Sequence, residues 1–161
     1  MRNLNPLEWA VLPLKKYADF SGRAPRAEYW WFYLGTVVVS LVCALLDKAL
    51  GGRDIIGTIL NIALLVPWLA VTVRRLHDID RTGWWLLAFV GAFALAGSIA
   101  ALGTAGGMGL TAMFMAMIIV VVGVLGLAIT MLVFMVQAGT DGANRYGDDP
   151  YGPGNLEQVF A

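Results

Sequence analysis

Few residues in this sequence have side chains that suit chemistry. His77 is the only histidine, and it stands beside Asp78 and close to Asp80. An imidazole flanked by carboxylates has the donors to bind a metal ion or relay a proton. One histidine with scattered carboxylates is nevertheless a poor ligand set. We therefore predict no metal site, and we expect His77 to make a structural hydrogen bond to a carboxylate or to the C-terminal segment.

Nucleophiles and phosphate-binding loops are equally scarce. Cys43, Ser40 and Ser98 all lie inside long apolar stretches, away from any base that would activate them. The glycines between residues 103 and 109 are not followed by the lysine and serine or threonine of a phosphate-binding loop. The sequence thus predicts no catalytic residue, no cofactor and no enzymatic activity.

Composition places these residues in a membrane protein. The chain has 161 residues, of which 59% are hydrophobic and only 14% charged, and 11 basic residues balance 11 acidic ones. This composition excludes a disordered chain, and the absence of excess positive charge argues against nucleic-acid binding. So few charges would not cover the apolar surface of a soluble enzyme.

The charges are confined to short islands, and the uncharged stretches between them are long enough to cross a bilayer as helices. The last uncharged stretch is too long for one helix, and the glycine-rich residues 103–109 predict a turn that divides it. We expect an all-α, four-helix transmembrane bundle, with spans at about residues 29–46, 55–73, 84–102 and 112–136. Asn61 and Pro67 make the second span the least regular of the four.

An even number of spans puts both termini on one side of the membrane. That side carries nine of the 11 basic residues, so the positive-inside rule predicts that both termini are cytoplasmic. Before the first span, Leu7, Val11 and Leu14 recur near helical spacing beside two lysines. We expect an interfacial amphipathic helix at about residues 6–20, the alternative being a loop broken at Pro13. Residues 1–150 would form a single domain, and residues 151–161 a flexible tail.

Three polar motifs adjoin the predicted spans on the cytoplasmic side: GRAPRAEYWW at 22–31, RRLHDIDRTGWW at 74–85 and GTDGANRYGDDP at 139–150. Each alone is typical of topology signals, interface anchors or turns. Charges near lipid are costly unless paired, so we expect the acidic and basic members to pair. We also expect residues 141–150 to fold back against Arg74, Arg75 and the Arg23–Arg26 turn. The candidate cytoplasmic polar surface comprises Arg23, Arg26, Glu28, Arg74, Arg75, His77, Asp78, Arg81, Asn144, Tyr146 and Asp149. The predicted interface anchors are Trp30, Trp31, Trp84 and Trp85.

These three motifs resemble the Domain of Unknown Function 805 family, the YhaH-like bacterial inner-membrane proteins. The resemblance extends from about Leu7 to Pro150, and the RRLHD and GWW elements at this spacing are its most distinctive part. Ala143 and Asp148 depart from the pattern, because relatives often have proline there. The resemblance implies a small helical protein of the bacterial inner membrane, and it implies no reaction.

Two functional classes remain open. The first is a membrane scaffold or regulator whose polar surface binds a partner protein or anionic lipid headgroups. The alternative is an oligomeric small-solute channel or transporter, for which Asn61, Pro67 and Thr130 are the candidate membrane-embedded residues. Small residues at Ala88, Ala92, Ala96 and Ala100 allow close helix packing, either within one subunit or between subunits. The sequence leaves the oligomeric state open.

Overall fold

The computed structural model describes residues 4–104, 106 and 109–152, and within these ranges it is helical, with no strand. Its helices are α1 (Pro6–Lys15), α2 (Arg26–Ala49), α3 (Ile55–Asp78), α4 (Trp84–Thr104) and α5 (Leu110–Val136). The chain divides into two compact units, and each is described here by itself. The first unit combines residues 1–81 with residues 138–161, and the second comprises residues 82–137.

Helix α1 packs against α2 in the first unit. It begins with a capping box in which Asn5 and Glu8 satisfy each other's backbone amides, and Pro13 lies inside the helix rather than ending it. Ala10 meets Gly35 of α2, where an added β-carbon would come within 3.5 Å of the alanine methyl. The helix is shorter than the predicted 6–20, because the chain turns after Lys15. Its place at the membrane interface stays a prediction.

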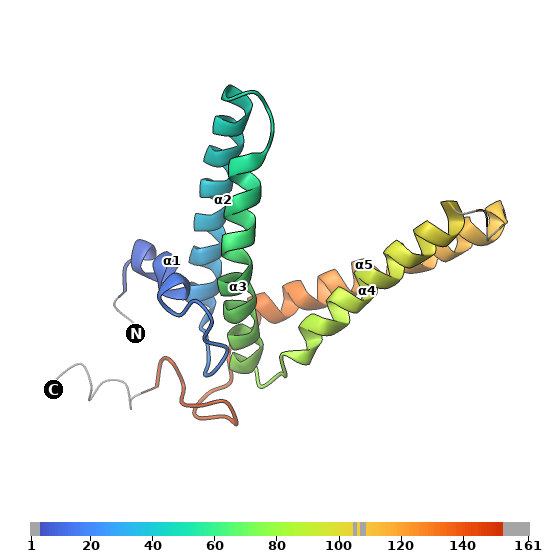
Figure 1. Cartoon of the computed structure of the whole chain (residues 1–161). Helices are drawn as coiled ribbons and strands as arrows, with labels where there is room; N and C mark the ends of the chain where they lie inside the picture. Colours follow the sequence, from blue (N-terminus) through green and yellow to red (C-terminus); the bar gives the residue numbers. More distant parts are fainter. Residues whose placement is uncertain (1–3, 105, 107–108, 153–161) are drawn as a thin grey trace. The chain divides into compact units, whose positions relative to one another are not determined.

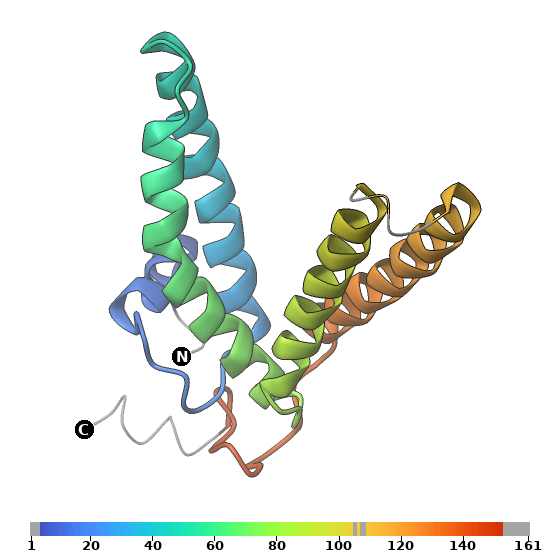
Figure 2. The ribbon, with the colours of Figure 1, turned by 45° about the vertical axis from the view of Figure 1, so that its right-hand side comes forward.

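Helices α2 and α3 run side by side as a hairpin, seen in both Figure 1 and Figure 2. Asp47, near the end of α2, caps the start of α3: its carboxylate accepts the backbone amides of Ile56 and Gly57 at 3.0 and 2.8 Å. Asp54 precedes α3 but makes no side-chain cap. The cap of α3 therefore comes from the preceding helix. The Asp47 backbone carbonyl also accepts the Gly52 amide at 2.7 Å, just after the end of α2.

A proline inside α3 is accommodated by a side chain from outside the helix. Pro67 has no amide hydrogen, so the carbonyl of Ala63, four residues earlier, lacks its usual helical partner. The Tyr17 hydroxyl donates to that carbonyl at 2.5 Å. The turn after α1 therefore stabilises α3 at the point where its own hydrogen bonding fails.

Helices α4 and α5 form a second hairpin, drawn in yellow and orange in Figure 1. The glycine-rich break is confirmed, since α4 ends at Thr104 and α5 begins at Leu110, with Ala105, Gly107 and Met108 outside the described residues. Gly103 lies directly against the Met113 side chain, which would have to shift to make room for a β-carbon at this position. Ala96 and Ala100 line an apolar cavity shared with α5, so this half of the alanine stripe lies within the hairpin.

The all-α fold with four long apolar helices is confirmed, because α2, α3, α4 and α5 are all long and apolar enough to cross a membrane. Their ends extend beyond the predicted spans. The largest extension is in α3, which continues five residues past the predicted end at 73, to Asp78. It does so because the charged residues of its last turn are paired inside the protein. The single domain over 1–150 stays a prediction, and residues 153–161 of the predicted tail lie outside the described residues.

Candidate functional site

Charged side chains are buried together where α2 begins and α3 ends. We call this group the polar core; its members are Arg23, Glu28, Arg74, Arg75 and Asp78. Arg23 lies in the turn before α2, and Glu28 lies in the first turn of α2. The other three members lie in the last turns of α3. Residues 138–152, which we call the fold-back segment, pass beside them. Buried charges are costly unless they are paired and hydrogen-bonded. The polar core pairs its charges in two places, and in the first of them the hydrogen bonding is incomplete.

The first place is the pair of Glu28 and Arg74. Arg74 Nη1 donates to Glu28 Oε1 at 2.6 Å, and both side chains are 0% exposed. Glu28 Oε2, Arg74 Nε and Arg74 Nη2 are buried without a hydrogen-bond partner among the described residues. The pair links α2 to α3, and the backbone amide of Ala24 adds a bond to the Arg74 carbonyl at 2.9 Å.

The second place is Asp78, which joins three segments. Its two carboxylate oxygens accept from Arg23 Nε at 3.0 Å and from Arg75 Nη1 at 2.5 Å. Its backbone carbonyl accepts the Thr140 amide at 2.9 Å. Gly139 lies directly against the carboxylate, where a β-carbon would overlap its terminal atoms. Asp78 thus ties the turn before α2 to α3 and to the fold-back segment.

Arg23 secures the fold-back segment through backbone carbonyls. Its Nη1 donates to the Gly142 carbonyl and its Nη2 to the Thr140 carbonyl, both at 2.6 Å. A planar guanidinium can bind a carboxylate and two carbonyls at once, which a lysine ammonium does with far less geometric control. The expected fold-back is therefore present, and Arg23 is its principal partner in place of Arg74.

His77 acts as a structural bridge. Its Nδ1 lies 3.2 Å from the Gly22 carbonyl, which requires the proton on Nδ1. The imidazole stacks on the Tyr146 ring with centroids 3.8 Å apart, and Asn144 Nδ2 donates to the His77 carbonyl at 2.9 Å. The imidazole makes a structural hydrogen bond, but its acceptor is the Gly22 carbonyl, which is neither a carboxylate nor part of the C-terminal segment. The imidazole contacts that segment by stacking on Tyr146 instead. Within the described residues, no cluster of histidine, cysteine and carboxylate side chains is suited to a metal ion.

The end of α3 carries a further, exposed ion pair. Arg145 Nε lies 3.0 Å from Asp80 Oδ1, and both side chains are about half exposed. Asp80 has a φ of 55°, and the amides of Asp80 and Arg81 return to the carbonyls of His77 and Leu76. This is a Schellman ending, with aspartate where glycine is usual.

The turn before α2 is ordered by two local hydrogen bonds. Ser21 donates both its hydroxyl and its backbone amide to the Asp19 carboxylate. These bonds hold the pKa of Asp19 below its ordinary value, because they stabilise the charged form.

The remaining predicted site residues lie toward the surface. Arg26 and Arg81 are exposed, and Asp149 is half-buried. Together with Arg23 and Asp78, Arg26 and Asp149 line a small polar cavity of about 230 Å³ beside the fold-back segment. Of the predicted anchors, Trp31 and Trp84 are exposed, whereas Trp30 and Trp85 are half-buried. Trp30 packs edge-on against Tyr33, and Trp85 against Phe134.

Sequence reasoning missed several residues that organise the first unit. Gly139 and Thr140 contact Asp78. Tyr17 donates to the carbonyl that Pro67 leaves without a helical partner. Asp47 caps the start of α3, at the other end of the hairpin. The proline at position 67 was a usable signal, because it leaves a carbonyl that needs a donor. For Gly139, no periodicity or charge pattern indicates which side chain it must approach.

Comparison with known proteins places the chain in a family. A family model described as "Protein of unknown function (DUF805)" matches residues 17–148, which include every member of the polar core. The chain belongs to the DUF805 family. Two relatives in Escherichia coli (strain K12) are similar to it over nearly their whole length. Inner membrane protein YhaH is 38% identical over 149 residues, covering 89% of this chain and 97% of the relative. Inner membrane protein YhaI is 33% identical over 145 residues, covering 89% and 96%. No solved structure is significantly similar to this DUF805 chain.

Proposed function

We propose that this chain is a multi-pass scaffold or regulator of the bacterial inner membrane, with both termini in the cytoplasm. Two relatives bear the name of inner membrane proteins, and the distribution of basic residues favours this orientation. In this proposal, the end of the first unit that carries the polar core is an interaction surface for anionic lipid headgroups or a partner protein.

The observation that carries the proposal is the division of the polar residues into a buried set and an exposed set. Arg74 and Arg75 are 0% exposed and form buried ion pairs, so their role is structural and they are not available to bind a ligand. Arg26 and Arg81 are exposed at the same end of the first unit and are suited to bind negative charge. Arginine fits phosphate and carboxylate groups because its donors form a planar fork.

Neutralising the exposed arginines tests this proposal. Arg26→Gln with Arg81→Gln should lower the retention of phosphatidylglycerol in native mass spectrometry, or the yield of a partner cross-linked and captured from native membranes. The matched control is Lys48→Gln with Arg53→Gln, which removes two exposed charges at the opposite end of the α2–α3 hairpin. A thermal unfolding scan of each variant confirms that the fold is kept. Unchanged lipid retention and unchanged capture would contradict the proposal.

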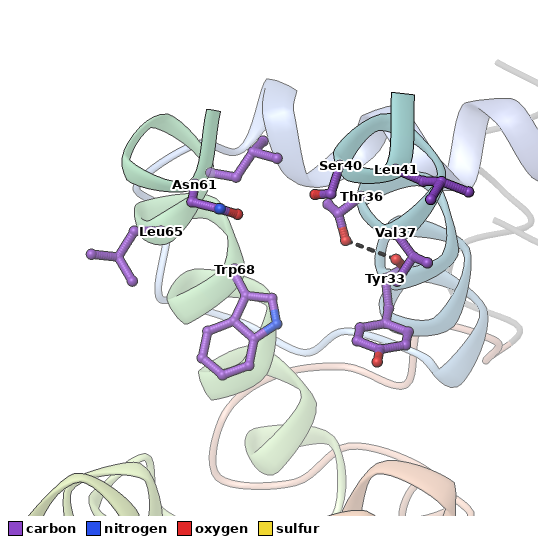
Figure 3. Close-up of a pocket in the computed structure, with 9 residues that line it drawn as sticks. Tyr33, Thr36, Val37, Ser40, Leu41, Asn61, Leu65 and Trp68 are labelled. Atoms are coloured by element: carbon purple, nitrogen blue, oxygen red, sulfur yellow. Dashed lines mark hydrogen bonds between the residues drawn. The ribbon is translucent and has the colours of Figure 1, made fainter. Parts of the chain in front are cut away.

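A channel or transporter is the second candidate function, and one observation favours it. A groove of about 640 Å³ on the α2–α3 hairpin is lined in part by Asn61, Ser40 and Thr36, which are polar side chains in otherwise apolar helices (Figure 3). Solute flux into proteoliposomes that disappears in Asn61→Leu would support this function over the first. Absence of flux across a broad solute panel would count against it.

A further inference from the structure

The small polar cavity beside the fold-back segment is formed entirely within the first unit. It lies between the turn before α2, the end of α3 and the fold-back segment, all of which belong to that unit. Its volume is about 230 Å³. We call it the fold-back cavity. Its charged lining residues are Arg23, Arg26, Asp78, Asp141 and Asp149.

Two of these charges serve the protein's own structure. Arg23 donates to the Asp78 carboxylate and to two backbone carbonyls of the fold-back segment, and Asp78 also accepts from Arg75. The Arg23 and Asp78 side chains are 1% and 5% exposed. Arg26 and Asp141 are exposed, and Asp149 is half-buried. The charges that a ligand can reach are therefore one guanidinium and two carboxylates.

The mixture of signs selects the chemical class of ligand. An anion attracted by Arg26 would be repelled by Asp141 and Asp149. A simple cation would be attracted by the carboxylates and repelled by Arg26. A zwitterion carries a group of each sign and complements both. The cavity is smaller than the pockets of about 300–1,000 Å³ that hold drug-sized ligands, so the zwitterion must be small.

The Asp149 carboxylate is oriented by backbone amides. Its Oδ1 accepts the Tyr151 amide at 2.8 Å, and its Oδ2 accepts the Gly142 amide at 3.4 Å. An ionised carboxylate has about four lone-pair sites, so these two bonds orient it without exhausting its capacity to accept. A side chain that is oriented in advance loses less conformational entropy when it binds an ammonium group.

The cavity adjoins the start of a candidate membrane span. Arg26 is the first residue of α2, which is long and apolar enough to cross a membrane. Trp31, in the second turn of α2, is 39% exposed and suits the headgroup layer. A lipid headgroup is therefore a zwitterion that can reach the cavity. This step rests on the proposed function, which makes this end of the first unit a surface for lipid headgroups.

We propose that the fold-back cavity binds the headgroup of phosphatidylethanolamine. Arg26 binds the phosphate, because the planar fork of a guanidinium matches two phosphate oxygens. The ammonium group donates hydrogen bonds to the carboxylates of Asp149 and Asp141. Free phosphoethanolamine has the same two charged groups, so the experiment must distinguish the lipid from the soluble molecule.

Lipid retention in native mass spectrometry tests the proposal. The protein is equilibrated with phosphatidylethanolamine and phosphatidylcholine that have identical acyl chains. Phosphatidylcholine has the same phosphate, but its quaternary ammonium has no hydrogen to donate. We expect retention of phosphatidylethanolamine to exceed that of phosphatidylcholine by about fivefold to tenfold, the effect of one charge-assisted hydrogen bond. Equal retention of the two lipids would overturn the proposal.

A pair of neighbouring aspartates supplies the variant and its control. Asp149→Asn removes the negative charge and keeps an oxygen that can accept the Tyr151 amide, and it should abolish most of the preference. Asp148→Asn is the matched control, because Asp148 is exposed and does not line the cavity. An unchanged preference in Asp149→Asn, or an equal loss in Asp148→Asn, would overturn the proposal. Asp141→Asn, at an exposed position, is a second test that should also lower the preference.

Added phosphoethanolamine distinguishes the two sources of the headgroup. It should displace little of the retained phosphatidylethanolamine, because it lacks the apolar contacts of the acyl chains. Complete displacement by an equimolar amount would overturn the assignment to a lipid. The proposed function is measured separately, by phosphatidylglycerol retention in the variants of Arg26 and Arg81. Normal loss of phosphatidylglycerol in those variants, without a preference for phosphatidylethanolamine in the parent, would refute this inference alone.

Discussion

The two hairpins of this protein are stabilised by different kinds of interaction. The second unit, residues 82–137, contains no charged residue, and its polar side chains Ser98 and Thr130 bond only within their own helices. The first unit holds every buried charged side chain of the described residues. The α2–α3 hairpin depends on directional contacts between particular atoms, and the α4–α5 hairpin on apolar length and packing.

This difference means that the two hairpins should tolerate substitutions to different degrees. An apolar helix pair tolerates many substitutions, since lipid accepts any apolar side chain. A buried polar core tolerates few substitutions, because removing one charged side chain leaves its partner buried and unpaired. The first unit is therefore where single substitutions should have their largest effects.

Breaking the buried ion pair should have the largest effect. Arg74→Met leaves the Glu28 carboxylate buried without its partner, and it should lower the free energy of unfolding by about 3–5 kcal/mol. Thr130→Val in α5 removes a hydroxyl that bonds only to its own helix, and it should cost less than about 1 kcal/mol. Equilibrium unfolding in mixed micelles measures both values. Equal losses of unfolding free energy in the two variants would show that the two hairpins do not differ in how they are stabilised.

The same substitution, glycine to alanine, should have opposite effects in the two units. Gly139→Ala places a methyl group against the Asp78 carboxylate, which two arginines hold in place, and should cost about 1–3 kcal/mol. Gly91→Ala in α4 meets no neighbouring atom, and should gain about 0.5–1 kcal/mol from helix propensity. Melting temperatures in one detergent compare the pair directly. A Gly139→Ala variant as stable as the parent would show that the fold-back segment is not closely packed on Asp78.

A smaller effect should appear at Tyr17. Tyr17→Phe removes the donor to the Ala63 carbonyl and should cost about 1 kcal/mol. In a Pro67→Ala background the helix supplies its own amide donor, so the same change should cost less. A double-mutant cycle on the free energy of unfolding measures the coupling between positions 17 and 67. Additive losses would show that Tyr17 acts independently of the proline.

Much of this architecture could be predicted from the sequence. Uncharged stretches separated by charge islands indicated four long helices, and the glycines at 103–109 indicated the break between α4 and α5. The expected grouping of the three polar motifs is present around Arg23 and Asp78. The long helices and the grouping of the polar motifs both follow from where apolar and charged residues can be solvated. That depends on the types of residue and on their order in the sequence.

The parts that could not be predicted depend on exact atomic positions. The sequence marks Arg74 and Arg75 as charges near a helix end, a pattern equally typical of exposed headgroup contacts. Only three-dimensional packing distinguishes their complete burial from that exposure. The role of Asp47 as a cap for α3 likewise depends on where the chain returns after its loop.

Trypsin cleavage after Arg145 tests the central claim, that the fold-back segment is an integral part of the first unit. Arg53, in the exposed loop between α2 and α3, serves as the internal reference for accessible cleavage. In the folded protein, cleavage after Arg145 should be slower than in an unfolded control by at least about tenfold, because it requires the segment to open. Arg23→Gln, which removes contacts to Thr140, Gly142 and Asp78, should accelerate it. Cleavage after Arg145 at the rate of the unfolded control, in a protein that is otherwise folded, would contradict this account.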